Sequence, residues 1–126
     1  GIGKVKSAFH LSEAIQQVKP DIVINQGTAG TINHQVGDVF VCRHFVDRDM
    51  HKMTGLGMEY RIDSSELLAA RGFCQHWTES ATCNTGDSFL TELTDIEGDV
   101  VDMEAYAQAF VCRVKFLLFR LSMFRM

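Results

Sequence analysis

Two carboxylates, Asp102 and Glu104, lie within three residues after a pair of valines and are the residues best suited to do chemistry. A carboxylate at the start of a helix is favoured by the helix dipole. Such a group can accept two hydrogen bonds from neighbouring hydroxyls, which is how acidic residues commonly hold a sugar diol. A second interpretation stays open, in which Asp102 caps the helix and Glu104 only complements the dipole.

Two further segments could bring polar groups to a ligand. Residues 27–30 (GTAG) are expected to form a tight turn whose backbone N–H groups and hydroxyl approach a ligand oxygen, although ordinary turns share this pattern. Phe89 ends a second polar segment, 84–89, and could stack on a base or pack in the core. Ligands of open α/β sheets bind at the carboxyl ends of the strands, so neighbouring strands would bring these segments to one pocket.

The elements that must position these residues follow from hydrophobic patterning. Apolar residues at helical spacing predict a helix from Val5 to Val18, ending near Lys19 because Pro20 disfavours helical geometry before it. Short β-branched or apolar runs predict strands over residues 22–24, 39–46, 81–83 and 99–101. Helices are expected over residues 64–70 and 104–113, a helical turn over 89–93, and a long loop over 47–62. This order predicts an α/β fold with three layers, in which helices flank a mixed, largely parallel sheet.

Length and charge limit the function classes. The 126 residues fit one domain, spanning 1–126. A net charge of -4 argues against nucleic acid as a partner. The apolar tail, residues 116–126, is too short and too interrupted by arginine to span a membrane. A buried strand and a membrane-surface segment are both interpretations of this tail, and the strand is the one we favour.

The four cysteines, Cys42, Cys74, Cys83 and Cys112, are far apart and form no metal-ligand pattern with the histidines. Cys74 and His76 lie two residues apart, but two ligands do not make a zinc site. Free buried thiols in the reducing cytoplasm are therefore expected, with no bound metal.

Five segments together resemble the nucleoside phosphorylase and nucleosidase superfamily, and especially its methylthioadenosine/S-adenosylhomocysteine nucleosidases. They are residues 1–5 (GIGKV), 20–30 (PDIVINQGTAG), 36–39 (VGDV), 85–90 (TGDSFL) and 101–105 (VDMEA). They occur in the order of that family and at about its spacing, across nearly the whole chain. The resemblance implies cleavage of an N-glycosidic bond in a small nucleoside through an oxocarbenium-like transition state, without a cofactor.

The resemblance also implies roles for individual residues. Glu104 would hold the ribose 2′- and 3′-hydroxyls, and Met103 would pack against the sugar. Phe89 and Leu90 would line the purine site, and Thr28 would stand near the nucleophile. That nucleophile is water in nucleosidases and phosphate in phosphorylases, many of which carry a phosphate-binding arginine where this chain has Asn25. Hydrolysis is therefore expected rather than phosphorolysis, which remains an alternative.

The sequence departs from the family at both ends. The water-activating glutamate of the family lies upstream of the segments present here, and Met123 follows Ser122 where the family has its purine-protonating aspartate. The catalytic acid and base are thus not found, and we expect a chain that is incomplete at both ends. A third interpretation follows, in which the chain binds nucleosides or self-associates without catalysing a reaction. Family members are dimers or larger, so the resemblance also implies a homodimer.

Overall fold

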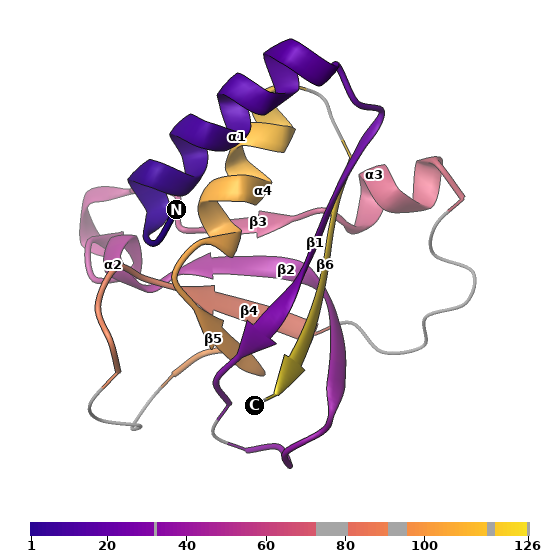
Figure 1. Cartoon of the computed structure of the whole chain (residues 1–126). Helices are drawn as coiled ribbons and strands as arrows, with labels where there is room; N and C mark the ends of the chain where they lie inside the picture. Colours follow the sequence, from indigo (N-terminus) through magenta and orange to yellow (C-terminus); the bar gives the residue numbers. More distant parts are fainter. Residues whose placement is uncertain (32, 73–80, 91–95, 116–117, 126) are drawn as a thin grey trace.

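The computed structural model describes residues 1–31, 33–72, 81–90, 96–115 and 118–125 (Figure 1). Helix α1 (Lys4–Val18) packs against helix α4 (Ala105–Val114), and α4 packs against a six-stranded sheet. The strands are β1 (Ile22–Ala29), β2 (Val39–Asp47), β3 (Arg61–Asp63), β4 (Ala81–Thr85), β5 (Val100–Asp102) and β6 (Leu118–Arg125). The remaining helices are α2 (Arg48–His51), α3 (Ser65–Ala70) and the short 3₁₀ helix η1 (Thr54–Leu56).

The sheet is mixed, with the order β1-β6-β2-β4-β5 and β3 paired with β2. Three pairs are parallel (β1 with β6, β2 with β4, β4 with β5), whereas β2 runs antiparallel to β3 and β6. The predicted α/β class with a mixed, largely parallel sheet is confirmed, and the flanking helices are consistent with three layers. Residues 118–125 of the tail form β6 between β1 and β2, so the prediction of a strand in this segment is confirmed.

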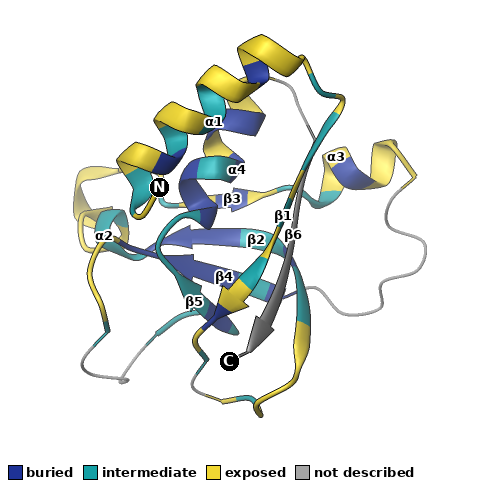
Figure 2. Ribbon diagram, viewed as in Figure 1, coloured by how far each residue is buried: buried dark blue, intermediate teal, exposed yellow. Residues whose placement is uncertain are grey.

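Helix α1 ends where the sequence predicts. Lys19 adopts a left-handed conformation (φ 50°) directly before Pro20, and its N–H donates to the carbonyl of Ile15 at 2.9 Å. Ile15 is buried, with Ala8 and Leu11 packed against the core, whereas the opposite face of the helix is exposed (Figure 2). The amphipathic pattern therefore sets which face of α1 lies inward.

The core lies between the sheet and α4. Phe45 and Cys42 of β2, Cys83 of β4, Val100 of β5 and Cys112 of α4 have no exposed surface. These three cysteines carry free thiols, as predicted, and burial raises the pKa of Cys112 to about 11. Cys74 and His76 lie outside the described residues. Within the described ranges, no group of three His, Cys, Asp or Glu residues is arranged to hold a metal ion.

Two sequence predictions for the loops were wrong. Residues 27–29 of the predicted turn are instead the end of β1, because β6 pairs with β1 along its whole length, from Ile22 to Ala29. Residues 47–62 are not one long loop: they contain α2 and η1, and β3 begins at Arg61. The side chain of Asp47 starts α2 by accepting from the N–H groups of Asp49 and Met50, and β3 is held by antiparallel pairing with β2.

Residues 89 and 90 are not helical, and the rest of the helical turn expected over 89–93 lies outside the described residues. The other predicted helices and strands are present, with ends that differ by a few residues.

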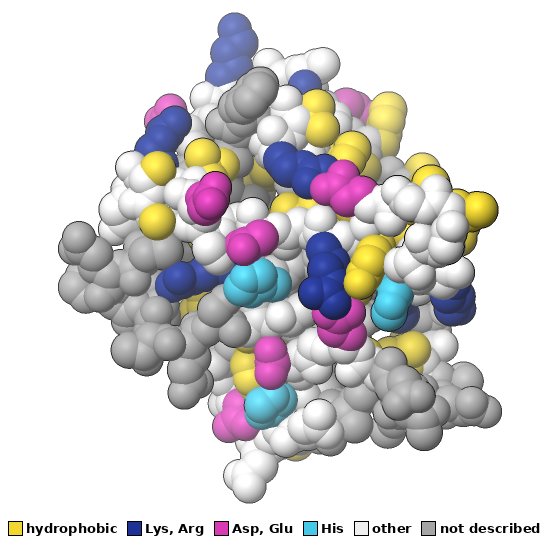
Figure 3. Space-filling view, turned by 180° about the vertical axis from the view of Figure 1, so that it is seen from behind, with side chains coloured by type: hydrophobic (Ala, Val, Ile, Leu, Met, Phe, Trp, Pro, Cys, Tyr) yellow, Lys and Arg dark blue, Asp and Glu magenta, His cyan; other side chains and the backbone are white. Residues whose placement is uncertain are grey.

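Charges of both signs are mixed on the surface. On the face shown in Figure 3, lysine and arginine side chains alternate with acidic ones, and the described residues there form no extended basic patch. Among the described helices, none is long and apolar enough to cross a membrane.

Candidate functional site

A cavity of about 500 Å³ lies beyond the carboxyl ends of β1, β4 and β5. The end of β1 is held beside β5 by two backbone hydrogen bonds between Gly30 and Val101, of 2.8 and 3.1 Å. The sheet therefore brings together three segments that are far apart in the sequence. The lining residues are Thr28, Ala29, Gly30, Thr31, Arg48, Ser88, Phe89, Leu90, Val101, Asp102, Met103 and Glu104.

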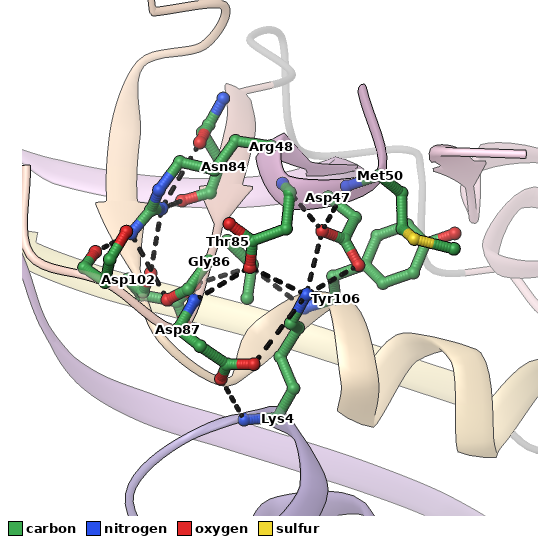
Figure 4. Close-up of polar contacts among 12 residues, drawn as sticks. Lys4, Asp47, Arg48, Met50, Asn84, Thr85, Gly86, Asp87, Asp102 and Tyr106 are labelled. Carbon is green, nitrogen blue, oxygen red and sulfur yellow. Dashed lines mark hydrogen bonds and ion pairs between the residues drawn. The ribbon is translucent and has the colours of Figure 1, made fainter. Parts of the chain in front are cut away.

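Asp102 joins the end of β5 to the start of α4. Its Oδ2 accepts from the N–H groups of Glu104 (3.1 Å) and Ala105 (2.7 Å), which caps the helix. Its Oδ1 accepts from the hydroxyl of Thr85 at 2.6 Å, and that hydroxyl accepts from the N–H of Tyr106 at 3.0 Å (Figure 4). The capping role considered for Asp102 is thus confirmed, and both of its carboxylate oxygens are engaged within the protein.

Glu104 occupies the N-cap position of α4, but its side chain makes no capping hydrogen bond. Its Oε1 instead accepts from the backbone N–H of Gly3 at 2.9 Å. Among the described residues, none donates a hydrogen bond to Oε2. Glu104 therefore differs from Asp102 in keeping acceptor capacity for a ligand in the cavity.

Arg48 fastens the loops around the cavity. Its Nη1 donates to the carbonyl and side-chain oxygens of Asn84 (3.0 and 3.3 Å) and to the carbonyl of Asp102 (3.2 Å). Its Nη2 donates to the carbonyls of Gly86 (3.2 Å) and Ser88 (2.6 Å), as Figure 4 shows in part. Both terminal nitrogens of the guanidinium are thus occupied by protein oxygens at the wall of the cavity, whereas the buried Nε has no hydrogen-bond partner among the described residues.

A second polar cluster lies beside the cavity and centres on Lys4. Its ammonium contacts both oxygens of Asp47, at 2.9 and 3.0 Å, and Asp49 Oδ2 at 2.9 Å. Burial would lower the pKa of Lys4, but the hydrogen bonds and charges of Asp49 and Asp47 outweigh it and raise that pKa. Lys4 therefore carries its charge at neutral pH.

The family of the chain follows from its sequence profile as well as its fold. The profile of the phosphorylase superfamily matches residues 1–115. The chain belongs to the phosphorylase superfamily.

Similar members of the superfamily are nucleosidases. The chain is 33% identical over 138 residues to the 5′-methylthioadenosine/S-adenosylhomocysteine nucleosidase of Bacillus velezensis and 32% identical over 136 residues to that of a Marinomonas species. Each alignment covers 89% of this chain but 58% of the relative, so the chain spans a little over half the length of these proteins.

Solved structures of such nucleosidases share the fold. The enzyme from Neisseria meningitidis, in complex with methylthio-immucillin-A, has a TM-score of 0.80 at 28% identity. The enzyme from S. pneumoniae, with the transition-state inhibitor MT-ImmA, has a TM-score of 0.80 at 26% identity. Both matches cover 99% of this chain and 64% of the solved chain.

All five residues to which the superfamily resemblance assigns a role line the one cavity: Thr28, Phe89, Leu90, Met103 and Glu104. Phe89 is 85% exposed, so its ring does not belong to the core. Asn25 is not among the lining residues, and its side chain donates to Gln108 of α4 at 2.7 Å. The structure thus brings the five residues together, while their roles stay predictions.

Sequence reasoning missed Arg48, Lys4 and the aspartates around Lys4. The sequence did contain a signal, because a charged run from Asp47 to Asp49 lies at the carboxyl end of β2, a place where polar side chains meet the sheet edge. Assigning residues 47–62 to a loop concealed this signal. Lys4 belongs to one of the segments that carry the superfamily resemblance, but no pattern in the sequence connects it to Asp47.

Proposed function

We propose that this chain is a single domain of a purine nucleosidase, an enzyme that hydrolyses the N-glycosidic bond of nucleosides such as methylthioadenosine. Its own part in that reaction is to bind the nucleoside. The observation that carries the proposal is Glu104, a carboxylate with acceptor capacity at the wall of a cavity that Phe89 also lines. Glu104 would bind the ribose hydroxyls, with Met103 against the sugar, Phe89 and Leu90 at the purine, and Thr28 near the nucleophile.

Arg48 supports hydrolysis over phosphorolysis. Of the described residues that line the cavity, it is the only one with a permanent positive charge, and its two terminal nitrogens already donate to five protein oxygens. A phosphate nucleophile would need such donors. Base release that is stimulated by phosphate would therefore contradict this argument and favour a phosphorylase.

A second candidate is a domain that binds nucleosides without cleaving them. Among the described residues that line the cavity, Asp102 and Glu104 carry the carboxylates. Both carboxylate oxygens of Asp102 already accept hydrogen bonds within the protein. Glycoside cleavage commonly needs an acid for the leaving group and a base for the water. Incubation of the purified chain with methylthioadenosine distinguishes the two: we expect little adenine, and rapid release would place the catalytic groups within this chain.

The binding role has its own test. We expect Glu104→Ala to weaken adenosine binding in isothermal titration calorimetry by about 10- to 100-fold, because hydrogen bonds to a charged group contribute about 1.5–3 kcal/mol. Glu66→Ala removes an exposed carboxylate from α3 and serves as the matched control. An unchanged dissociation constant for Glu104→Ala would refute the ribose role.

We also propose a homodimer in the cytoplasm. Apolar side chains are exposed on both packed helices, among them Val5 and Phe9 of α1 and Phe110 and Val114 of α4. A second copy would cover such a surface. A reducing compartment fits the free thiols of the core. Phe110→Glu should lower the apparent mass in light scattering; a mass equal to one chain before substitution would refute the dimer.

A further inference from the structure

The carboxylate of Glu104 is held by a residue 101 positions earlier in the sequence. Gly3 donates its N–H to Glu104 Oε1 at 2.9 Å, in a partly buried contact. The φ of Gly3 is 92°, a conformation that other residues rarely adopt, so glycine is needed where α1 begins. One oxygen of Glu104 is thus fixed by the start of a different helix.

Lys4, the residue after Gly3, is held through both its backbone and its side chain. The backbone N–H of Lys4 donates to Asp87 Oδ1 at 2.8 Å, and its ammonium contacts Asp47 and Asp49. Asp49 in turn accepts from the N–H of Asp87 at 3.0 Å. The three aspartates come from the end of β2, from α2 and from the loop after β4. Lys4 therefore ties the start of α1 to three elements around the cavity.

This anchor is stronger than an ordinary surface ion pair. The side chains of Lys4 and Asp47 are only 17% and 6% exposed. A buried carboxylate that loses its cation is left as an uncompensated charge, whereas an exposed pair contributes little. Removing the ammonium would also leave Asp47 and Asp49 close to each other without a cation between them. The start of α1, including Gly3, would then lose its fixed place.

We propose that Lys4 is a positioning residue for Glu104, which acts by holding the Gly3 N–H on Glu104 Oε1. The proposal rests on the proposed function, because it takes Glu104 as the residue that binds the ribose diol. With Oε1 fixed by Gly3, Oε2 and the second lone pair of Oε1 face the ligand in one orientation. A side chain that is already ordered loses less entropy when the ligand binds.

The test compares adenosine with 2′,3′-dideoxyadenosine, which lacks the diol. We expect Lys4→Met to weaken adenosine binding by about tenfold and to leave dideoxyadenosine binding unchanged. The tenfold loss corresponds to the cost of ordering the Glu104 side chain and of weakening part of its hydrogen bonding to the diol. Lys6→Met, at an exposed position of the same helix, is the matched control and should change neither. Equal weakening of both ligands by Lys4→Met would indicate a merely structural role and overturn the proposal.

A second readout needs no ligand. In ¹H–¹⁵N spectra, Glu104→Ala should shift the amide proton of Gly3 upfield, since its acceptor is removed, and Lys4→Met should do the same. A Gly3 amide that ignores Lys4→Met would overturn the positioning step alone. Wild-type protein that does not distinguish the two nucleosides would instead refute the ribose role, and with it this proposal.

Asp87→Ala takes the place of Lys4→Met if circular dichroism shows that Lys4→Met does not fold. Asp87 has a side chain that is 50% exposed, and its loss removes the acceptor for the Lys4 backbone N–H. The same selective loss of adenosine affinity is expected, in a smaller amount. Unchanged selectivity in a folded Asp87→Ala variant would overturn the proposal.

Discussion

Gly86 is the position at which a single methyl group should disturb the site most. It is buried directly after β4, and the side chain of Arg48 fills the space where a Cβ of this residue would lie. A Cβ added to Gly86 would lie 2.6 Å from Arg48 Cζ and closer still to Arg48 Nε, well inside van der Waals contact. The φ of Gly86 lies outside the left-handed region, so an alanine would suffer from the contact and not from its backbone conformation.

The cost of Gly86→Ala follows from what Arg48 would lose by moving. Its guanidinium donates to five oxygens at 2.6–3.3 Å, and a shift that clears the methyl group weakens several of these hydrogen bonds at once. Overpacking costs about 1–3 kcal/mol, and a lost hydrogen bond to a charged group costs about as much again. We therefore expect Gly86→Ala to lower the free energy of unfolding by about 2–6 kcal/mol.

Urea unfolding followed by circular dichroism measures this loss. Gly55→Ala is the matched control, because no atom lies within 4 Å of its added Cβ, and it should change stability by less than about 0.5 kcal/mol. In an Arg48→Ala background the contact is absent, so Gly86→Ala should cost clearly less there. The reasoning is refuted if Gly86→Ala is as stable as wild type, or if its cost is the same in both backgrounds.

Three further predictions concern the hydrogen bonds at the start of α4, the loss of stability at low pH and the buried thiols. Thr85→Val removes the hydroxyl that accepts from Tyr106 N–H, and should cost about 1–3 kcal/mol in thermal unfolding, unlike the exposed Thr54→Val. Burial would raise the pKa of Asp49, but hydrogen bonds, one of them from Lys4, lower it below its ordinary value of 3.8. Ionised Asp49 therefore stabilises the fold above that ordinary pKa, and this stabilisation is lost as the pH falls through the lower pKa of the folded state. The stability difference between wild type and Lys4→Met should accordingly shrink below about pH 4, and a constant difference would contradict the pairing. Cys112, buried with a raised pKa, should react with a thiol reagent at pH 8 only after urea unfolding.

The elements that depend on their own sequence were predictable. The apolar spacing between Val5 and Val18 and the stop at Pro20 are local signals, and they located α1. The β-branched and aromatic run from Val39 likewise located β2. In both, the information lies within one stretch of chain, because hydrophobic periodicity and proline sterics act over a few residues.

What could not be predicted depends on partners distant in sequence. Gly27 to Ala29 contain a glycine that suggests a turn, yet they extend β1 because β6 pairs with them from the other end of the chain. The contact of Lys4 with Asp47 likewise requires α1 to begin beside the end of β2. The sequence did predict which three segments could form a site, because strand ends of an α/β sheet meet at one edge.

The role of Glu104 is the central claim, and calorimetric titration of wild type and Glu104→Ala with adenosine and 2′,3′-dideoxyadenosine tests it most directly. We predict that wild type binds adenosine about 10- to 100-fold more tightly than the dideoxy compound, since the diol hydrogen bonds end on a charged group. Glu104→Ala should bind the two compounds equally. Equal affinity in the wild type, or a preference for adenosine that survives in Glu104→Ala, would contradict the account.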